Sequence, residues 1–216
     1  MVGRVVFQQY TVQERVADLC IHAIGVAASL VALGVLLVIG VTSPAALWGV
    51  GLTIYGLALV ATFGFSAGYH IAVRPKLKAL LRRLDHAAIF LMIAGTYTPF
   101  VLIKMNNAWG LGLLATVWTM AAIGIAIKLF APRHLDSVAT ALYLVQGWAV
   151  LAVWEPLMSA VPGRVVTLLL IGGALYTIGV VFHLWQRLPF QNAIWHGFVL
   201  SAASCHYAAV LFAVQS

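Results

Sequence analysis

The sequence predicts an all-α integral membrane protein, a seven-transmembrane helix bundle that forms one domain over residues 1–216. Hydrophobic residues make up 63% of the chain and charged residues only 8%, whereas a soluble fold carries about 25% charged residues. The apolar residues gather into seven runs, each near the length of about 20 residues that crosses a bilayer as a helix. These runs are too long and continuous for the alternating strands of a membrane β-barrel.

Short segments with charged or turn-forming residues separate the runs. In chain order the runs are Leu19–Ile39, Ala45–Ile71, Ala87–Ile103, Ala108–Leu129, Val138–Leu157, Val165–Trp185 and Ala193–Val214. The segments that follow the first six runs are, in the same order, Thr42-Ser43-Pro44, Arg74-Pro75-Lys76 with Arg82-Arg83, Lys104-Met105-Asn106-Asn107, Pro132-Arg133-His134, Pro162-Gly163-Arg164 and Arg187-Leu188-Pro189. The fifth run contains Gln146 and Glu155, and without it every later span would reverse direction.

The basic residues predict the orientation in the membrane. If the N-terminus is cytoplasmic, all the Lys and Arg residues fall on the cytoplasmic side except Lys104 and Arg164. Such an excess of positive charge is typical of the cytoplasmic side. We therefore expect the N-terminus inside and the C-terminus outside a bacterial inner or cell membrane. Topology and anionic lipid headgroups explain the net charge of +7, and no nucleic-acid partner is expected.

The histidines gather near one face of the predicted bundle. On this topology six of the seven lie toward the cytoplasmic side, together with Asp85: His22, His70, His86, His134, His183 and His196. Ionisable groups inside a membrane are costly and usually functional, and histidine is the commonest metal ligand. His206 lies ten residues beyond His196, or about 15 Å along a helix, and is interpreted as a buried, hydrogen-bonded residue or as part of the lining of a deeper cavity.

Two spacings favour a metal site in this layer. Ser66 and His70 are four residues apart and share a helix face, and so do Asn192 and His196. We expect these two helices to present facing imidazoles, with Asp85 between them. Two or three protein ligands and an open position form a catalytic zinc site, and a nearby carboxylate can orient a water molecule or take its proton.

Some of the histidines have a plainer interpretation. A single histidine near a membrane interface is usually a hydrogen-bonded packing residue. We keep that interpretation for His134 and His183. His22 is equally consistent with an interfacial position and with supporting a ligand site.

Two further patterns are interpreted structurally. Glu14 and Asp18 flank Arg15, which indicates ordinary charge pairing beside the membrane. Gly64 and Gly68 form a G-x-x-x-G pair, which is expected to let a neighbouring helix pack closely.

Several segments resemble the hemolysin III family, the bacterial branch of the progestin and adipoQ receptor family, which includes the adiponectin receptors. They are Glu14-Arg15 followed by His22, Ser66-Ala-Gly-Tyr-His70, the stretch from Leu84-Asp85-His86 to Pro99-Phe100, Asn192-Ala-Ile-Trp-His196, and Ser204-Cys-His-Tyr207. The motifs occur in order on the second, third and seventh predicted helices, and the resemblance covers nearly the whole chain.

The resemblance implies a zinc site near the cytoplasmic face. His70 would be a zinc ligand, Asp85 would hold the zinc-bound water and Ser66 would sit beside them. His196 matches the second histidine of a family H-x-x-x-H pair, and Asn192 stands where the first would be. An amide oxygen is a poorer zinc ligand than imidazole. Zinc would then bind through His70, His196 and Asn192, or with water, Asp85 or a shifted histidine in place of the amide.

The related receptors and alkaline ceramidases imply hydrolysis of a lipid amide. We therefore predict a zinc-dependent hydrolase that acts on a lipid amide or ester in membrane homeostasis. Asp85 would act as the base, and Ser66 would bind the substrate or the water. Two alternatives are a non-enzymatic membrane sensor with a structural metal and a cytolytic pore. Membrane lipids are the expected partners, and no oligomeric state is predicted.

Overall fold

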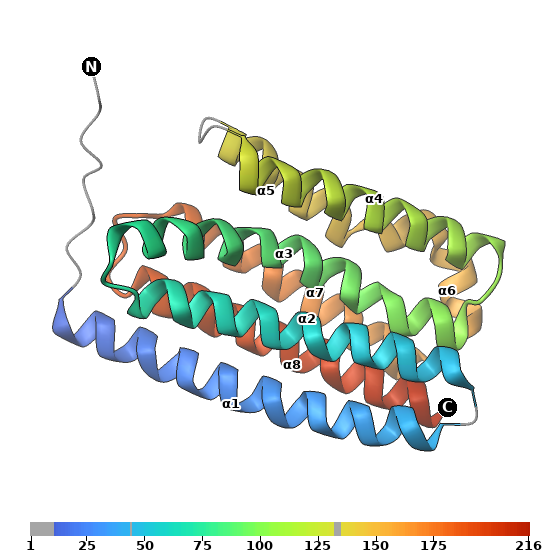
Figure 1. Ribbon diagram of the computed structural model, residues 1–216. Helices are drawn as coiled ribbons and strands as arrows, with labels where there is room; N and C mark the ends of the chain where they lie inside the picture. The colour runs from blue at the N-terminus through green and yellow to red at the C-terminus, as the bar shows by residue number, and fades with distance from the viewer. Residues whose placement is uncertain (1–10, 44, 132–134) are drawn as a thin grey trace.

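The computed structural model describes residues 11–43, 45–131 and 135–216, and in these ranges it contains helices and no strand (Figure 1). The elements are α1 (Val12–Thr42), α2 (Ala46–Ile71), α3 (Pro75–Lys104), α4 (Ala108–Phe130), α5 (Asp136–Gly147), the short 3-10 helix η2 (Ala149–Val153), α6 (Trp154–Ala160), α7 (Gly163–Leu184) and α8 (Gln191–Gln215). Seven stretches are long and apolar enough to cross a membrane, and α5, η2 and α6 together form the fifth. The predicted all-α fold with seven spans is confirmed, whereas the orientation of the termini stays a prediction.

Helices α1 and α3 begin earlier than their apolar runs. A capping box starts α1: the Thr11 hydroxyl accepts the backbone N–H of Glu14 at 3.2 Å, and the Glu14 carboxylate accepts the backbone N–H of Thr11 at 2.8 Å. Pro75 stands at the first position of α3, where its missing N–H costs nothing. As a result Glu14 and Asp18 lie on α1 itself, not in a segment that precedes it.

The helices run roughly side by side, with α1 at one edge of the bundle and the α4–α5 pair at the opposite edge (Figure 1). Helix α1 packs against α2 and α8, α3 packs against α2 and α4, and α7 packs against α8. Because successive spans alternate in direction, the starts of α1, α3 and α8 lie at the same end as the finishes of α2 and α7.

This end carries five of the histidines, and we call it the histidine end: His22, His70, His86, His183 and His196. The predicted gathering of histidines is therefore confirmed for these five. His134, interpreted as a packing residue, lies outside the described residues, as do Arg4 and Arg133 of the charge count.

The outward faces of the helices are apolar. Val31, Val38 and Phe130 are 69%, 63% and 82% exposed. Such faces are stable against lipid tails and costly against water. Together with the seven spans they identify a multi-pass membrane protein.

The close contact between α1 and α2 does not fall at the predicted glycine pair. A Cβ at Gly64 would meet no atom within 4 Å, and one at Gly68 would meet only the Leu81 side chain, at 3.4 Å. The prediction that this pair brings helices together is wrong. Other glycines have that role: a Cβ at Gly40 would lie 3.0 Å from the backbone of Gly49, and a Cβ at Gly56 would lie 2.6 Å from the Leu33 side chain of α1.

The fifth span is broken between α5 and η2. The Tyr97 hydroxyl of α3 donates to the carbonyl of Gly147 at 2.8 Å and accepts the backbone N–H of Val150 at 3.1 Å. Gln146, fully buried, donates its amide to carbonyls of α3 and α4 at 3.3 and 3.0 Å. Because the membrane interior supplies no water to unpaired backbone groups, Tyr97 makes the break tolerable.

Replacing the Tyr97 hydroxyl is expected to destabilise the protein. Tyr97→Phe leaves the Val150 N–H without its partner, which costs about 1–3 kcal/mol for a buried donor. Thermal unfolding in detergent should show a lower melting temperature. Gln146→Leu is the matched control, with a smaller effect, because the carbonyls that Gln146 contacts lie inside helices. Equal stability of Tyr97→Phe and the unmodified chain would contradict this account of the break.

Candidate metal centre

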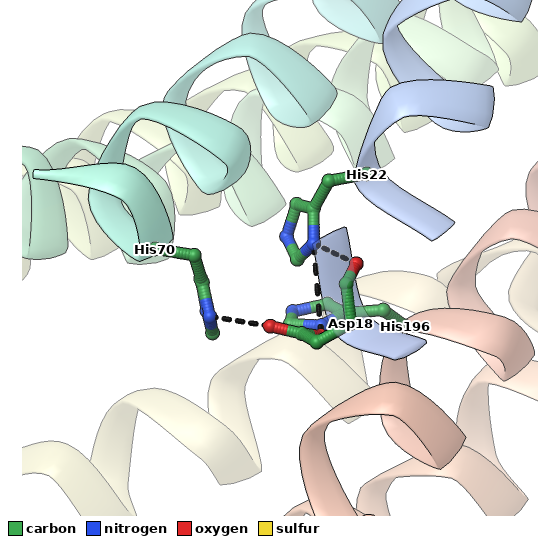
Figure 2. Close-up of side chains that lie close together, drawn as sticks. All are labelled: Asp18, His22, His70 and His196. Atoms are coloured by element: carbon green, nitrogen blue, oxygen red, sulfur yellow. Dashed lines mark hydrogen bonds and ion pairs between the residues drawn. The ribbon is translucent and has the colours of Figure 1, made fainter. Parts of the chain in front are cut away.

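Four side chains from three helices meet at the histidine end: Asp18 and His22 of α1, His70 of α2 and His196 of α8 (Figure 2). One potential ligand atom from each lies within 4.8 Å of the others. The centroids of the three imidazole rings are 4.3 to 4.9 Å apart. Asp18 and His22 are buried. Carboxylate and imidazole groups this close together form a donor set suited to a metal ion.

Asp18 connects the three histidines. Its carboxylate accepts a hydrogen bond from Nδ1 of His70 at 2.6 Å and from Nδ1 of His196 at 2.7 Å. Its backbone carbonyl accepts a hydrogen bond from Nδ1 of His22 at 2.7 Å. Carbonyl and carboxylate oxygens accept and do not donate, so these contacts assign the proton to Nδ1 in each ring. Each Nε2 then carries a lone pair, the form in which a histidine ligates a metal.

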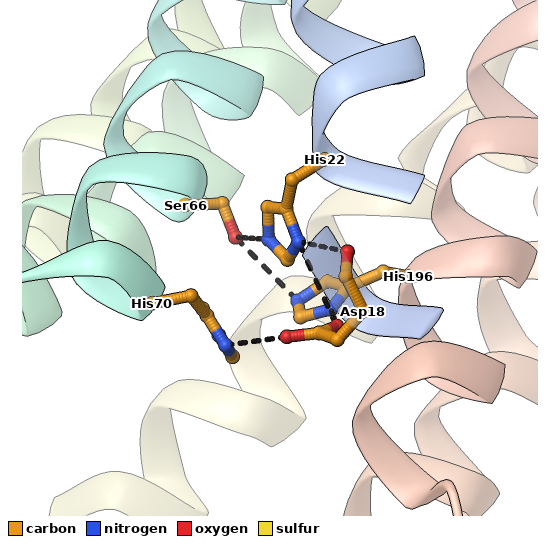
Figure 3. A network of polar contacts seen from close by, with 5 residues as sticks. All are labelled: Asp18, His22, Ser66, His70 and His196. Atoms are coloured by element: carbon orange, nitrogen blue, oxygen red, sulfur yellow. Dashed lines mark hydrogen bonds and ion pairs between the residues drawn. The ribbon is translucent and has the colours of Figure 1, made fainter. Parts of the chain in front are cut away.

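Ser66 lies where two of these Nε2 atoms converge (Figure 3). Its hydroxyl is 3.1 Å from Nε2 of His22 and 3.5 Å from Nε2 of His196. The side chain is buried, and α2 places it one turn before His70. Ser66 is therefore positioned to contact a ligand bound by the Nε2 atoms of His22 and His196.

The residues Gly64 to Gly68 around Ser66 also match, by letters, the G-x-S-x-G pattern of serine hydrolases. That pattern requires a sharp turn from a strand into a helix, and here all five residues lie within α2. Ser66, His196 and Asp18 follow one another as nucleophile, base and acid do in such enzymes. However, N–H groups inside a helix are already bonded and cannot stabilise an oxyanion. The cluster therefore fits a metal site better than a serine nucleophile.

Asp85 lies beside the four-residue cluster and does not belong to it. It lines the same cavity as Ser66 and His70, and its carboxylate interacts with the Ser66 hydroxyl and with the charge of Arg82. Asn192 lines this cavity one turn before His196. The histidine that joins His70 and His196 in the cluster comes instead from α1, as His22.

The interpretation of Asp18 as a residue of charge pairing beside the membrane is wrong. Because α1 begins at Val12, Asp18 lies on the helix one turn before His22, where its carboxylate contacts histidines of α2 and α8. One sequence signal points to this role. Asp18 and His22 are four residues apart, the same spacing as Ser66 and His70.

Three further histidines line the same cavity. The rings of His86 and His183 lie 6.4 Å apart, and His183 packs against Trp195, as the packing interpretation predicts. Nε2 of His206 donates to the Leu169 carbonyl at 3.2 Å. The predicted hydrogen bond of His206 is confirmed, and the half-buried side chain also lines the cavity.

The cavity has a volume of about 670 Å³ and reaches from the cluster far into the bundle. Its lining includes Met105, Leu113 and Leu157, which belong to the end of the bundle opposite the histidines. Most of the lining is apolar, with polar side chains concentrated at the histidine end. The cavity therefore joins a polar end to a long apolar interior.

Comparison with known proteins identifies the family of this chain. Residues 10–207 match the family described as haemolysin-III related. Hemolysin-3 of Bacillus cereus is 40% identical over 203 residues, which cover 94% of this chain and 93% of that protein. The Hemolysin-3 homolog of Bacillus subtilis (strain 168) is 37% identical, covering 94% of this chain and 95% of that protein. The human monocyte to macrophage differentiation factor is 32% identical, covering 73% of this chain and 67% of that protein. The chain therefore belongs to the haemolysin-III-related family of membrane proteins.

Proposed function

We propose that this protein is a zinc-dependent membrane hydrolase that cleaves an acyl amide or ester bond of a lipid. One observation carries the proposal. Three imidazoles with Nε2 lone pairs line the polar end of a largely apolar cavity of about 670 Å³. Ligand sites typically have such a volume and a few polar groups placed on an apolar wall.

The donor set suits zinc in its catalytic form. Three imidazole nitrogens with one open position are the ligands of several hydrolytic zinc sites. The Asp18 carboxylate would orient the imidazoles of His70 and His196 through their Nδ1 protons, as carboxylates beside zinc-bound histidines commonly do, and its backbone carbonyl would orient His22. When bound, a zinc ion supplies a Lewis acid that polarises a carbonyl and lowers the pKa of water.

Two side chains beside the cluster would carry out the proton transfers and hold the reacting groups. Asp85 would accept a proton from the attacking water, whose oxygen forms a bond to the carbonyl carbon. Asp85 would then return that proton to the leaving nitrogen or oxygen as its bond to carbon breaks. Ser66, which interacts with Asp85, would hold the water or the carbonyl oxygen by a hydrogen bond.

The apolar part of the cavity would hold the acyl chain. Each methylene group buried there contributes about 0.8 kcal/mol relative to water. A chain that enters from the bilayer leaves an equally apolar solvent, so the walls act mainly by shape and direction. The chain would thereby bring its carbonyl to the histidine end.

Metal analysis of purified variants tests the ligand set. The unmodified chain is expected to bind about one zinc per molecule, and His22→Ala, His70→Ala and His196→Ala are each expected to lose most of it. Asn192→Ala is the matched control and should keep its zinc. Elemental analysis after removal and return of zinc measures this. An Asn192→Ala variant that loses zinc while His22→Ala keeps it would contradict the assignment.

Hydrolysis of a panel of fatty-acyl amides and esters tests the reaction. Asp85→Asn should retain zinc and lose about 10²–10⁴-fold in turnover, because a general base contributes by that factor. Glu155→Gln also replaces a carboxylate by an amide, but at an exposed position of α6, and should leave turnover unchanged. Absence of hydrolysis by the zinc-loaded, unmodified protein on every lipid tested would exclude the enzyme.

A structural metal in a membrane sensor is the second candidate. With Asp18 counted as a ligand, the cluster offers four donor groups. Four protein ligands fill the coordination sphere of zinc and leave no position for a substrate. In that case removing zinc lowers the melting temperature, and Asp85→Asn changes neither stability nor phenotype. Loss of the phenotype in a stable, zinc-loaded Asp85→Asn variant would favour the enzyme.

A further inference from the structure

We infer that Glu14 is a positioning residue for the metal centre, because it holds the start of α8 at a fixed place on α1 and so sets His196 against His22 and Asp18. The inference rests on the proposed metal site. It assigns to Glu14 a role separate from starting the first helix.

The Glu14 carboxylate joins the two helices directly. One of its oxygens, Oε1, accepts the backbone N–H of Phe190 at 2.9 Å, across 176 residues of sequence. The other, Oε2, accepts the backbone N–H of Thr11 at 2.8 Å and its hydroxyl at 2.9 Å. One oxygen therefore completes the capping box of α1, and the other binds the residue that directly precedes α8.

Phe190 adopts a conformation that needs support. Its φ is 58°, in the left-handed region, and it is the one non-glycine residue with positive φ in the described part of the chain. A bulky residue stays in that region only when its surroundings hold it there. Glu14 binds its N–H from α1, and the Gln191 side chain, the next in sequence, donates to the His183 carbonyl of α7 at 2.9 Å. The turn is thereby fixed on both sides.

The hydrogen bond between Glu14 and Phe190 lies one helical turn from the metal-binding cluster. Glu14 and Asp18 are four residues apart and share one face of α1. Glu14 binds Phe190, and Asp18 binds His196, so two successive carboxylates of α1 hold the first two turns of α8. A metal site tolerates ligand distances only within about 0.2 Å. A small shift of α8 along α1 would therefore weaken metal binding.

Zinc affinity of the full-length protein in detergent, measured by competition with a chelator, tests the inference. Glu14→Ala should weaken zinc binding about 10–100-fold, the range found when a residue that supports a metal ligand is removed. Thr11→Ala is the matched control. It removes the capping hydroxyl but keeps the Glu14–Phe190 contact, and should bind zinc as the unmodified chain does. Glu14→Gln keeps an oxygen for the Phe190 N–H and should retain more affinity than Glu14→Ala.

The outcomes separate three cases. Equal zinc affinity of Glu14→Ala and the unmodified chain, or equal losses in Glu14→Ala and Thr11→Ala, would overturn the positioning role and leave the metal site standing. Absence of zinc binding by the unmodified chain would overturn the metal site and this inference with it. If Glu14→Ala does not fold, Glu14→Asp replaces it. That variant keeps the charge but is too short to reach both partners, and binding equal to that of Thr11→Ala would overturn the inference.

Discussion

The carboxylate of Asp18 is the interaction on which the candidate site depends. A charged group is stable inside a membrane protein only when it is paired and hydrogen-bonded, and both oxygens of Asp18 accept a hydrogen bond from a histidine. These contacts bring α2 and α8 to α1 and place the proton of each ring on Nδ1. One side chain thus fixes both the position of the imidazoles and the nitrogen that faces a ligand.

The break in the fifth span lies beside the cavity that the cluster lines. The span is broken after α5, and Tyr97 takes up the backbone groups that the break exposes. At the break Trp148 donates to the Thr177 hydroxyl of α7 at 3.1 Å, and both side chains line the cavity. The broken span therefore stays attached to α3 and α7 beside the cavity, which joins an apolar interior to the polar histidine end.

The parts of this arrangement that follow from local patterns can be predicted from sequence. Seven apolar runs define the spans, and the positions of His70 and His196 within their runs place them at one end. The start of the first helix and its contact with the last one cannot be predicted from hydropathy alone. The start of α1 is set by the capping box of Thr11 and Glu14, not by hydropathy, so Asp18 looks like a flanking charge. That α1 lies beside α8, which brings His22 close to His70 and His196, follows from contacts between distant segments.

An anomalous-scattering measurement at the zinc edge, on crystals of the zinc-loaded protein, tests the central claim most directly. The account predicts one strong peak about 2.0–2.1 Å from Nε2 of His22, His70 and His196, with Asp18 on the Nδ1 side of the rings. A peak bound through Asn192 and away from His22, or a cluster without a peak, would contradict it.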